Sequence, residues 1–332
     1  MAVGYLEITG KIAVSQFWPS GESDGDTIRV TLDPPMKAFR FRPSQGAPAI
    51  PTKALYNAGF FEKDKKGVKK FKPVVQKGQI RIRLQGVDTP ELHYLPRVKG
   101  AKNFRQYVGE TATVELHKQL MKAGAQTVPC RVVTAVDKPN DAVDIYGRVV
   151  AEVLVPVDGN KELHINQWLV ESGWGFPAFY NTMSNPEINL LASAGSQAEK
   201  HHRGVWNRLY AKGKLTPFKW DLQYRRGGPP QPARDKGPLI MPKLFRRQCA
   251  YEVKVRTGKF TGKFADYLKS LRPPDKCHAT NDFLKLNGKA RRKRLSDFVT
   301  PTNRFLVTPA GLVFIEKAAT IVDSKNRPIR DW

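Results

Sequence analysis

Short segments in which apolar and polar residues alternate recur through the first half of the chain. Alternation of this kind predicts half-buried strands, because successive side chains of a strand point to opposite faces of a sheet. The clearest example begins at Ile80, where three apolar residues alternate with Arg81, Arg83 and Gln85. We expect strands at 5–17, 27–32, 80–85, 128–136 and 149–153.

Apolar residues spaced three and four apart predict helices between and after these strands. We expect one helix to begin near Asn103, one to cover 164–172, and one to run from Pro186 to Gly204. This order of elements indicates an α+β fold for residues 1–210. Five strands at regular spacing fit a closed barrel with helices packed on it, the OB-fold, whose open face commonly binds nucleic acid.

Three segments lie outside that pattern. Residues 34–79 form an insertion between the second and third strands, and residues 211–243 form a linker rich in proline and glycine. Residues 244–332 then form a smaller basic domain of α+β character that resembles no family. Within it we expect a strand at 251–255, a helix at 266–271, and a hairpin of 304–308 with 312–316.

The net charge of +26 indicates a polyanionic partner, most simply DNA or RNA. Residues 34–79 hold 11 basic and 2 acidic residues, and residues 211–332 hold 28 basic and 10 acidic residues. The rest of the chain is nearly neutral. We therefore expect the insertion and the C-terminal part to capture the substrate electrostatically.

No apolar run approaches the roughly 20 residues that a membrane-spanning helix needs, so we expect no membrane partner. The first residues carry no basic and apolar signal segment, which predicts a cytoplasmic protein, or a secreted one if a signal has been trimmed. The three cysteines are odd in number and far apart, which is typical of reduced thiols.

The end of the strand 80–85 carries the first candidate chemistry. Gly86 interrupts the alternation, and Pro90 ends the strand because proline donates no hydrogen bond to a ladder. The strand end therefore presents Arg83, Asp88, the Thr89 carbonyl and Glu91 close together. Two carboxylates beside an arginine are the parts of a metal-assisted phosphate site.

Two further motifs stand at strand ends. Asp26 and Thr27 end an Asp-Gly-Asp-Thr segment, and Tyr146-Gly-Arg148 precedes the last strand. Taken singly, the first is explained by a turn and the second by an exposed arginine. The order of the three motifs resembles the staphylococcal (micrococcal) nuclease family, or thermonucleases, over residues 5–209.

This resemblance implies a calcium-dependent endonuclease that hydrolyses DNA or RNA and leaves 3′-phosphate ends. It implies that Ca²⁺ is held by Asp26, Asp88 and the Thr89 carbonyl. Arg83 and Arg148 would clamp the scissile phosphate with two-pronged hydrogen bonds, and Glu91 would orient or deprotonate the attacking water. The family places aromatic residues in the nucleotide pocket, and Tyr146 and Tyr180 are the candidates here.

Basic residues of the appended segments are candidates for binding the substrate backbone. Phenylalanines lie among the lysines of the insertion, an arrangement that suits base stacking combined with phosphate pairing. A solvated hairpin with a small aromatic core is an equal alternative for that segment. The candidates are Lys65, Lys66, Lys69, Lys70, Arg291, Arg292 and Arg294.

A non-catalytic OB-type nucleic-acid binder is the alternative function. Such a protein would be expected to lack one or more of the carboxylates and arginines, whereas Asp26, Arg83, Asp88, Glu91 and Arg148 are all present. The sequence therefore favours a nuclease. It leaves open a protein partner for the C-terminal domain.

Overall fold

The structure is a computed structural model that describes residues 4–63, 68–124, 126–157, 161–207, 239–316 and 319–332. Its centre is a closed barrel of five strands, as the sequence predicts. The strand order is β10-β11-β8-β2-β1, and a pairing of β1 with β10 closes the ring. The strands are β1 (Tyr5–Ala13), β2 (Thr27–Leu32), β8 (Gln79–Leu84), β10 (Thr127–Ala135) and β11 (Val149–Pro156).

Alternation places the apolar side chains of each strand inside the barrel. Leu6, Ile8 and Ile12 of β1 are at most 1% exposed, as are the apolar residues of β8. Strand β1 pairs with β10 along its whole length and also with β2. This double pairing needs Gly10, because a Cβ there would lie 2.3 Å from the Thr31 carbonyl oxygen.

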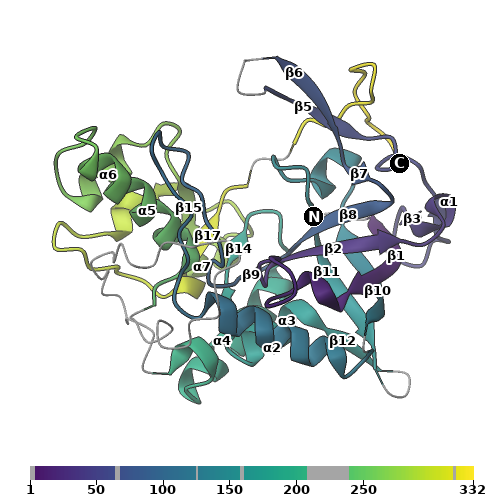
Figure 1. Cartoon of the computed structure of the whole chain (residues 1–332), viewed down its shortest axis with the longest axis horizontal. Coiled ribbons are helices and arrows are strands. Elements are labelled where there is room, and N and C mark those ends of the chain that lie inside the picture. Colours follow the sequence, from purple (N-terminus) through teal and green to yellow (C-terminus); the bar gives the residue numbers. More distant parts are fainter. Residues whose placement is uncertain (1–3, 64–67, 125, 158–160, 208–238, 317–318) are drawn as a thin grey trace.

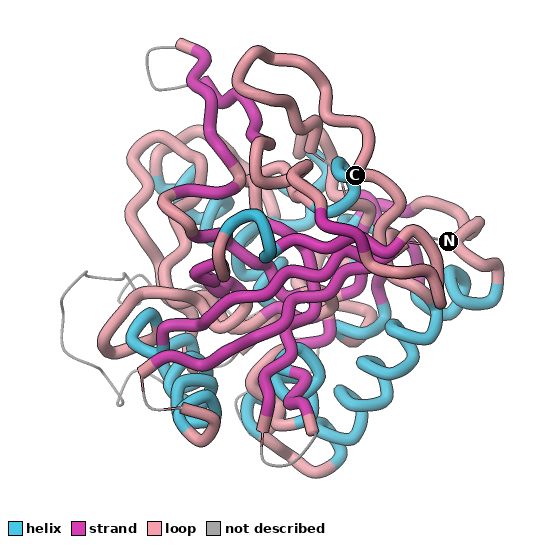
Figure 2. Tube along the Cα trace, turned by 90° about the vertical axis from the view of Figure 1, so that its right-hand side faces the viewer, coloured by secondary structure: helices cyan, strands magenta, loops and turns pink. Residues whose placement is uncertain are grey.

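Helices flank the barrel, whose strands cross the middle of the molecule in Figure 2. Helix α2 begins later than predicted, because Phe104 pairs through its backbone with Tyr94 before the helix starts. Helix α4 starts at a capping box made by Ser184 and Glu187. The elements of this part are β9 (Val87–Asp88), α2 (Gly109–Met121), β12 (Glu162–His164), α3 (Ile165–Glu171), β13 (Phe176–Pro177), β14 (Phe179–Tyr180) and α4 (Asn185–Lys200).

The insertion extends the sheet and sends out a hairpin. Strand β3 pairs with β1, β4 pairs with β3, and β5 and β6 form a separate antiparallel hairpin that projects from the barrel at the top of Figure 1. The elements are α1 (Pro35–Ala38), β3 (Phe39–Arg42), β4 (Ile50–Pro51), β5 (Gly59–Lys63), β6 (Lys69–Pro73) and β7 (Val75–Gln76).

The C-terminal part packs against the barrel part. Strand β17 pairs with β14, and the apolar cluster around α5 includes Phe104, Ala178 and Tyr180. At the end of the chain, Trp332 stacks on Phe41 of β3 at 4.9 Å between ring centroids. The elements are α5 (Pro242–Arg256), α6 (Phe264–Ser270), β15 (Lys276–Ala279), α7 (Thr280–Lys285), β16 (Lys293–Arg294) and β17 (Leu312–Phe314).

The strand predicted at 251–255 is wrong, because these residues are the last turns of helix α5. The five-residue window looks alternating only in isolation. Over the full helix, buried Leu244, Phe245, Gln248, Cys249 and Val253 recur at three- and four-residue steps, and Pro242 suits the first turn.

The predicted hairpin of 304–308 with 312–316 is also wrong. Residues 309–311 form a 3₁₀ turn, and Leu312–Phe314 pairs with β14 and β15 instead. All three residues of β17 are buried, and a continuous apolar run of this kind is typical of a central strand. The helix predicted at 266–271 is confirmed as α6.

No helix among the described residues is long and apolar enough to cross a membrane. Cys130, Cys249 and Cys277 are buried and form no disulfide. The predicted linker 211–243 lies mostly outside the described residues, and the structure describes it only from Leu239 onward.

Asp275 fixes α5 to the start of β15. Its carboxylate accepts from Arg247 at 2.5 and 2.6 Å and lies 3.5 Å from Lys243 Nζ. Burial alone would raise the pKa of Asp275, but Lys243 and Arg247 outweigh burial and lower that pKa to about 2. The pairing therefore stabilises the fold above pH about 4, and its contribution disappears as the pH falls toward 2.

We predict that Asp275→Asn lowers the free energy of unfolding near pH 7 by about 2 kcal/mol, the value that the pKa shift implies. Urea unfolding from pH 7 to 2 would measure it. The wild-type protein and the variant should differ most above pH 4 and converge toward pH 2. A difference that does not change across this range would contradict the assigned role of the carboxylate.

Candidate functional site

The pairing of the barrel strands brings the three sequence motifs to one end of the barrel. Thr27 of β2 lies opposite Arg83 of β8, and Val150 of β11 lies on the other side of Arg83. Asp26 therefore stands at the end of β2, where its carbonyl accepts from the Leu84 N–H at 2.9 Å. Asp88 follows two residues after a turn at Gly86, which has a φ of +77°.

The carboxylates at this end crowd one another. Burial raises the pKa of Asp26 to about 7, and the nearby charges of Asp88 and Asp24 add to the rise. Burial likewise raises the pKa of Glu91 to about 8, against the opposing effect of Arg246. Several acidic groups thus lie close together with little access to water. A nearby positive charge is needed to stabilise their ionised forms.

Arg148 is held in place by Asp144 of the same turn and by Thr27 of β2. Its Nε and Nη2 donate to Asp144 Oδ2 at 2.9 and 2.8 Å, and its Nη1 donates to the Thr27 hydroxyl at 3.0 Å. The Thr27 hydroxyl in turn donates to Asp26 at 3.0 Å. The arginine predicted from the Tyr-Gly-Arg motif is therefore linked directly to the carboxylate cluster.

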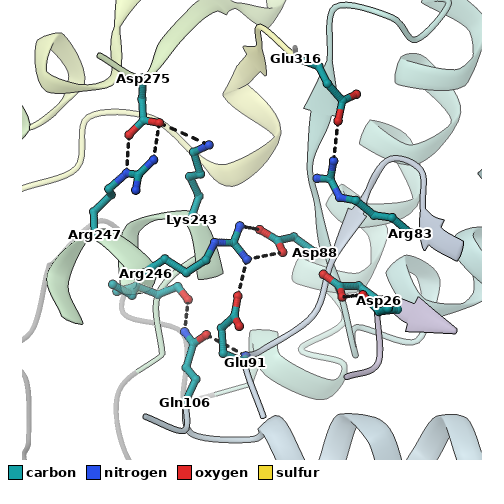
Figure 3. Close-up of polar contacts among 12 residues, drawn as sticks. Asp26, Arg83, Asp88, Glu91, Gln106, Lys243, Arg246, Arg247, Asp275 and Glu316 are labelled. Carbon is teal, nitrogen blue, oxygen red and sulfur yellow. Dashed lines mark hydrogen bonds and ion pairs between the residues drawn. The ribbon is translucent and has the colours of Figure 1, made fainter. Parts of the chain in front are cut away.

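The positive charge nearest to Asp88 comes from the C-terminal part of the chain. Arg246 of α5 donates to Asp88 through two nitrogens, to Oδ1 at 3.1 Å and to Oδ2 at 2.8 Å (Figure 3). It also forms a short contact with Glu91. Burial would raise the pKa of Asp88, but Arg246 outweighs burial and holds that pKa below its ordinary value.

Arg83 also has a C-terminal partner. Its Nη1 donates to Glu316 at 2.7 Å, and its guanidinium lies 4.3 Å from the centre of the Tyr180 ring. Phe314 of β17 lies 6.2 Å from the same ring. Tyr180 is thus only 9% exposed beneath β17, so it is not open to a nucleotide base in this structure.

Gln106 supports Glu91 from behind. Its side-chain oxygen accepts from the Glu91 N–H at 3.2 Å, and its side-chain nitrogen donates to the Ile240 carbonyl at 2.5 Å (Figure 3). The Gln106 N–H also donates to the Glu91 carbonyl at 2.8 Å. This residue therefore joins the site to the start of α5.

Tyr146 differs from the predicted catalytic and metal-binding residues because it is exposed. It is 46% exposed, and the guanidiniums of Arg97 and Arg148 lie 5.3 and 5.6 Å from its ring centre. Arg81 donates to its carbonyl at 2.8 Å. Cations around an accessible ring form a surface that suits stacking of a base with pairing of its phosphate.

The insertion hairpin reaches this same turn. Gly147 has a φ of +72°, and a Cβ there would lie 2.1 Å from the Phe60 ring of β5. Lys69 and Lys70 are exposed on β6 of that hairpin, whereas Lys65 and Lys66 lie outside the described residues. Two of the four predicted lysines thus stand on an element that packs against the Tyr146 turn.

The predicted arginines of the C-terminal part lie elsewhere. Arg291, Arg292 and Arg294 are exposed, and Arg294 belongs to β16. In the sheet order β14-β17-β15-β16, that strand is at the edge opposite β14. The structure does not bring these three arginines into contact with the carboxylate cluster.

The carboxylate and carbonyl oxygens at this end are the ligand types that Ca²⁺ prefers. The Asp24 Oδ1 and Thr89 Oγ1 atoms are buried and have no hydrogen-bond partner among the described residues. Both oxygens of Asp88, however, accept from Arg246, and the described residues include no group of three acidic, His or Cys side chains placed to hold a metal ion. As arranged here, the residues do not form a metal site.

The sequence gives no signal for Arg246, Glu316 or Gln106. Arg246 lies 158 positions from Asp88, and Glu316 lies 233 positions from Arg83. Arg246 and Glu316 are two of many charged residues in a basic segment, and Gln106 is an uncharged residue outside every motif. Only the tertiary structure identifies them as partners of the site.

We predict that Gln106→Leu lowers the free energy of unfolding by about 1–3 kcal/mol, because the Glu91 N–H and the Ile240 carbonyl would lose their partner. Chemical denaturation would measure the loss. Gln119→Leu on α2 is the matched control, since the Gln119 side chain accepts from the exposed Lys122 and lies away from the site. Equal stability of the two variants would show that Gln106 does not support the site.

Comparison with known families identifies one part of the chain. Residues 81–208 match the family model described as staphylococcal nuclease homologue. The match includes Arg83, Asp88, Glu91 and Arg148 and begins after Asp26. No curated protein matches the chain.

Proposed function

We propose that the protein is a phosphodiesterase that hydrolyses DNA or RNA, a function supported by the match of residues 81–208 to the staphylococcal nuclease homologue model. The observation that carries the proposal is the convergence of Arg83, Asp88, Glu91 and Arg148 with Asp26 at one end of the barrel. Two guanidiniums beside several carboxylates offer both the electrostatic stabilisation and the proton acceptor that phosphodiester cleavage needs.

In this proposal Arg83 and Arg148 hold the equatorial oxygens of the scissile phosphate. Their planar forks match two phosphate oxygens, which a lysine cannot do. Asp144 and Thr27 keep the Arg148 guanidinium in position before the substrate arrives. Glu91 orients the water or accepts its proton, and Gln106 fixes the backbone of Glu91.

Calcium dependence and 3′-phosphate products belong to the proposal through the family resemblance. Asp26, Asp88 and the Thr89 carbonyl are the proposed ligands, and Asp88 can serve only after it has separated from Arg246. We therefore assign no catalytic step to the metal. The exposed Tyr146 and the lysines of β6 are the proposed contacts for the flanking substrate.

A non-catalytic nucleic-acid binder is the second candidate, and one observation favours it. Asp26, Arg83, Asp88 and Glu91 are each at most 9% exposed and have protein partners, whereas the basic residues of β6 are exposed. A binder of this kind would hold DNA or RNA without cleaving it. Hydrolysis of a labelled oligonucleotide separates the two candidates.

We predict that the purified protein with Ca²⁺ cleaves labelled DNA or RNA and that a chelator stops it. Arg83→Ala and Arg148→Ala should each lower kcat by about 10²–10³-fold, the usual effect of removing a group aimed at developing charge. Glu91→Gln should lower kcat by about 10²–10⁴-fold. Gel analysis of the products would report both rate and end chemistry.

Arg131→Ala is the matched control for these arginine variants. Arg131 lies on β10 of the same barrel and pairs with Glu7 and Glu162 instead of with the site. Its loss should leave kcat within about twofold of wild type, in line with the small effects of exposed ion pairs. Binding without cleavage by the wild type, Arg246→Gln and Glu316→Gln would favour the binder.

A further inference from the structure

Two segments of the C-terminal part, α5 and residues 312–316, cover the candidate site, and we call them the cover. Each presents to the site a charge opposite to the group that it meets. Arg246 of α5 meets the carboxylates of Asp88 and Glu91, and Glu316 meets the guanidinium of Arg83 (Figure 3). The two contacts come from segments about 70 residues apart in the chain.

These partners have the charges of the groups that a nuclease site would bind. A guanidinium on Asp88 stands where a cation would be attracted, and a carboxylate on Arg83 stands where a phosphate would be attracted. Glu316 is held there by its own backbone N–H, which donates to Asn181 at 2.8 Å. Both the acidic and the basic groups of the site therefore have a partner of opposite charge on the cover, which a single chance ion pair would not explain.

The cover also closes the route to Arg83. Strand β17 lies against β14, so Phe314 covers Tyr180, and Lys243 lies 4.9 Å from the Phe314 ring. The Arg83 side chain is only 10% exposed and that of Glu316 only 12%. A polynucleotide phosphate cannot reach Arg83 while the cover is in place.

We propose that the cover inhibits the site from within the chain, with Arg246 in the place of the cation and Glu316 in the place of the phosphate. The inference rests on the proposed nuclease function and deepens it. Substrate and metal must then displace the cover. Opening the site costs part of the binding free energy, so the observed affinities for substrate and metal are lower than those of an open site.

A purely structural role for the two contacts is the competing explanation. Buried ion pairs seldom add net stability, because removal of both charges from water costs about as much as their attraction returns. A pair that contributes little to stability can still exclude a competing ion from its partner. The two explanations therefore differ in what removal of one cover charge does to ligand affinity.

The cover belongs to the part of the chain that would attract the substrate. Residues 211–332 hold 28 of the 56 basic residues, and Arg291 and Arg292 are exposed there. A polynucleotide drawn to this surface brings phosphates that compete with Glu316 for Arg83. The substrate itself is thus the agent that opens the site in this proposal.

The test uses the full chain with Arg246→Gln, Glu316→Gln and the double variant, which remove charge with little change in shape. Calorimetry would measure Ca²⁺ affinity, and fluorescence would measure binding of a labelled phosphorothioate dinucleotide that is too short to span the basic surfaces. Arg246→Gln should raise Ca²⁺ affinity, and Glu316→Gln should raise dinucleotide affinity, each by about ten- to hundredfold. The double variant should also cleave oligonucleotides faster than wild type.

Lys254→Gln is the matched control, because it removes a positive charge from the same helix, where Lys254 lies over Tyr267 and not at the site. Its affinities should equal those of the wild type. Arg246→Lys, which keeps a positive charge at the position, should fall between wild type and Arg246→Gln. If Arg246→Gln does not fold, Glu316→Gln and Arg246→Lys still carry the test.

Folded variants with wild-type affinities for both ligands would overturn the proposal. Failure of the nuclease function gives a different result, in which the variants bind Ca²⁺ and the dinucleotide more tightly but cleave nothing. Conversely, a wild type that cleaves as fast as the double variant would support the nuclease function and refute inhibition by the cover.

Discussion

The structure depends on how charge is balanced at the end of the barrel that carries the candidate site. Asp26, Asp88 and Glu91 are buried together, and an uncompensated cluster of carboxylates in a water-excluding site is strongly unfavourable. Arg246 supplies the guanidinium that Asp88 and Glu91 need. The barrel and the C-terminal part are therefore joined by electrostatics as well as by a shared sheet, and neither can be understood alone.

The same dependence extends to the apolar surface. Phe104, Ala178 and Tyr180 of the barrel part belong to the cluster that is completed by α5 and β17. A truncation after residue 210 would uncover these side chains and Arg83 at once. The role of the C-terminal part is thus better studied with single charge substitutions than by removing it.

Local patterns were enough to predict the barrel but not the contacts that the C-terminal part makes with it. The alternation in β1, β2, β8, β10 and β11 decides which face of each strand is buried, so the barrel and its motif-bearing ends followed from the sequence. The contact of Arg246 with Asp88 has no local cause, since it results from packing of distant elements. The burial of Tyr180 under β17 also has no local cause. It depends on a pairing that joins residues 179–180 with residues 313–314.

The two wrong assignments share a physical origin. A window of five residues at 251–255 cannot distinguish strand from helix, whereas the repeat of buried residues through the 15 residues of α5 can. The Pro-Ala-Gly turn at 309–311 suggested a local hairpin, but the fully apolar Leu312–Phe314 gains more burial between two other strands. In both places a short local signal was misleading, because the burial of the residues was decided by contacts beyond the window.

The position of Arg246 and Glu316 after the barrel residues in the chain has a consequence for biosynthesis. Ribosomes make chains from the amino terminus, and folded units form as they emerge. The barrel residues to 207 are thus complete before either segment of the cover has been translated. If the barrel folds at that stage, Arg83 is formed early but pairs with Glu316 only after synthesis has reached that residue. During this interval the new chain presents an uncovered Arg83 beside ribosomal RNA.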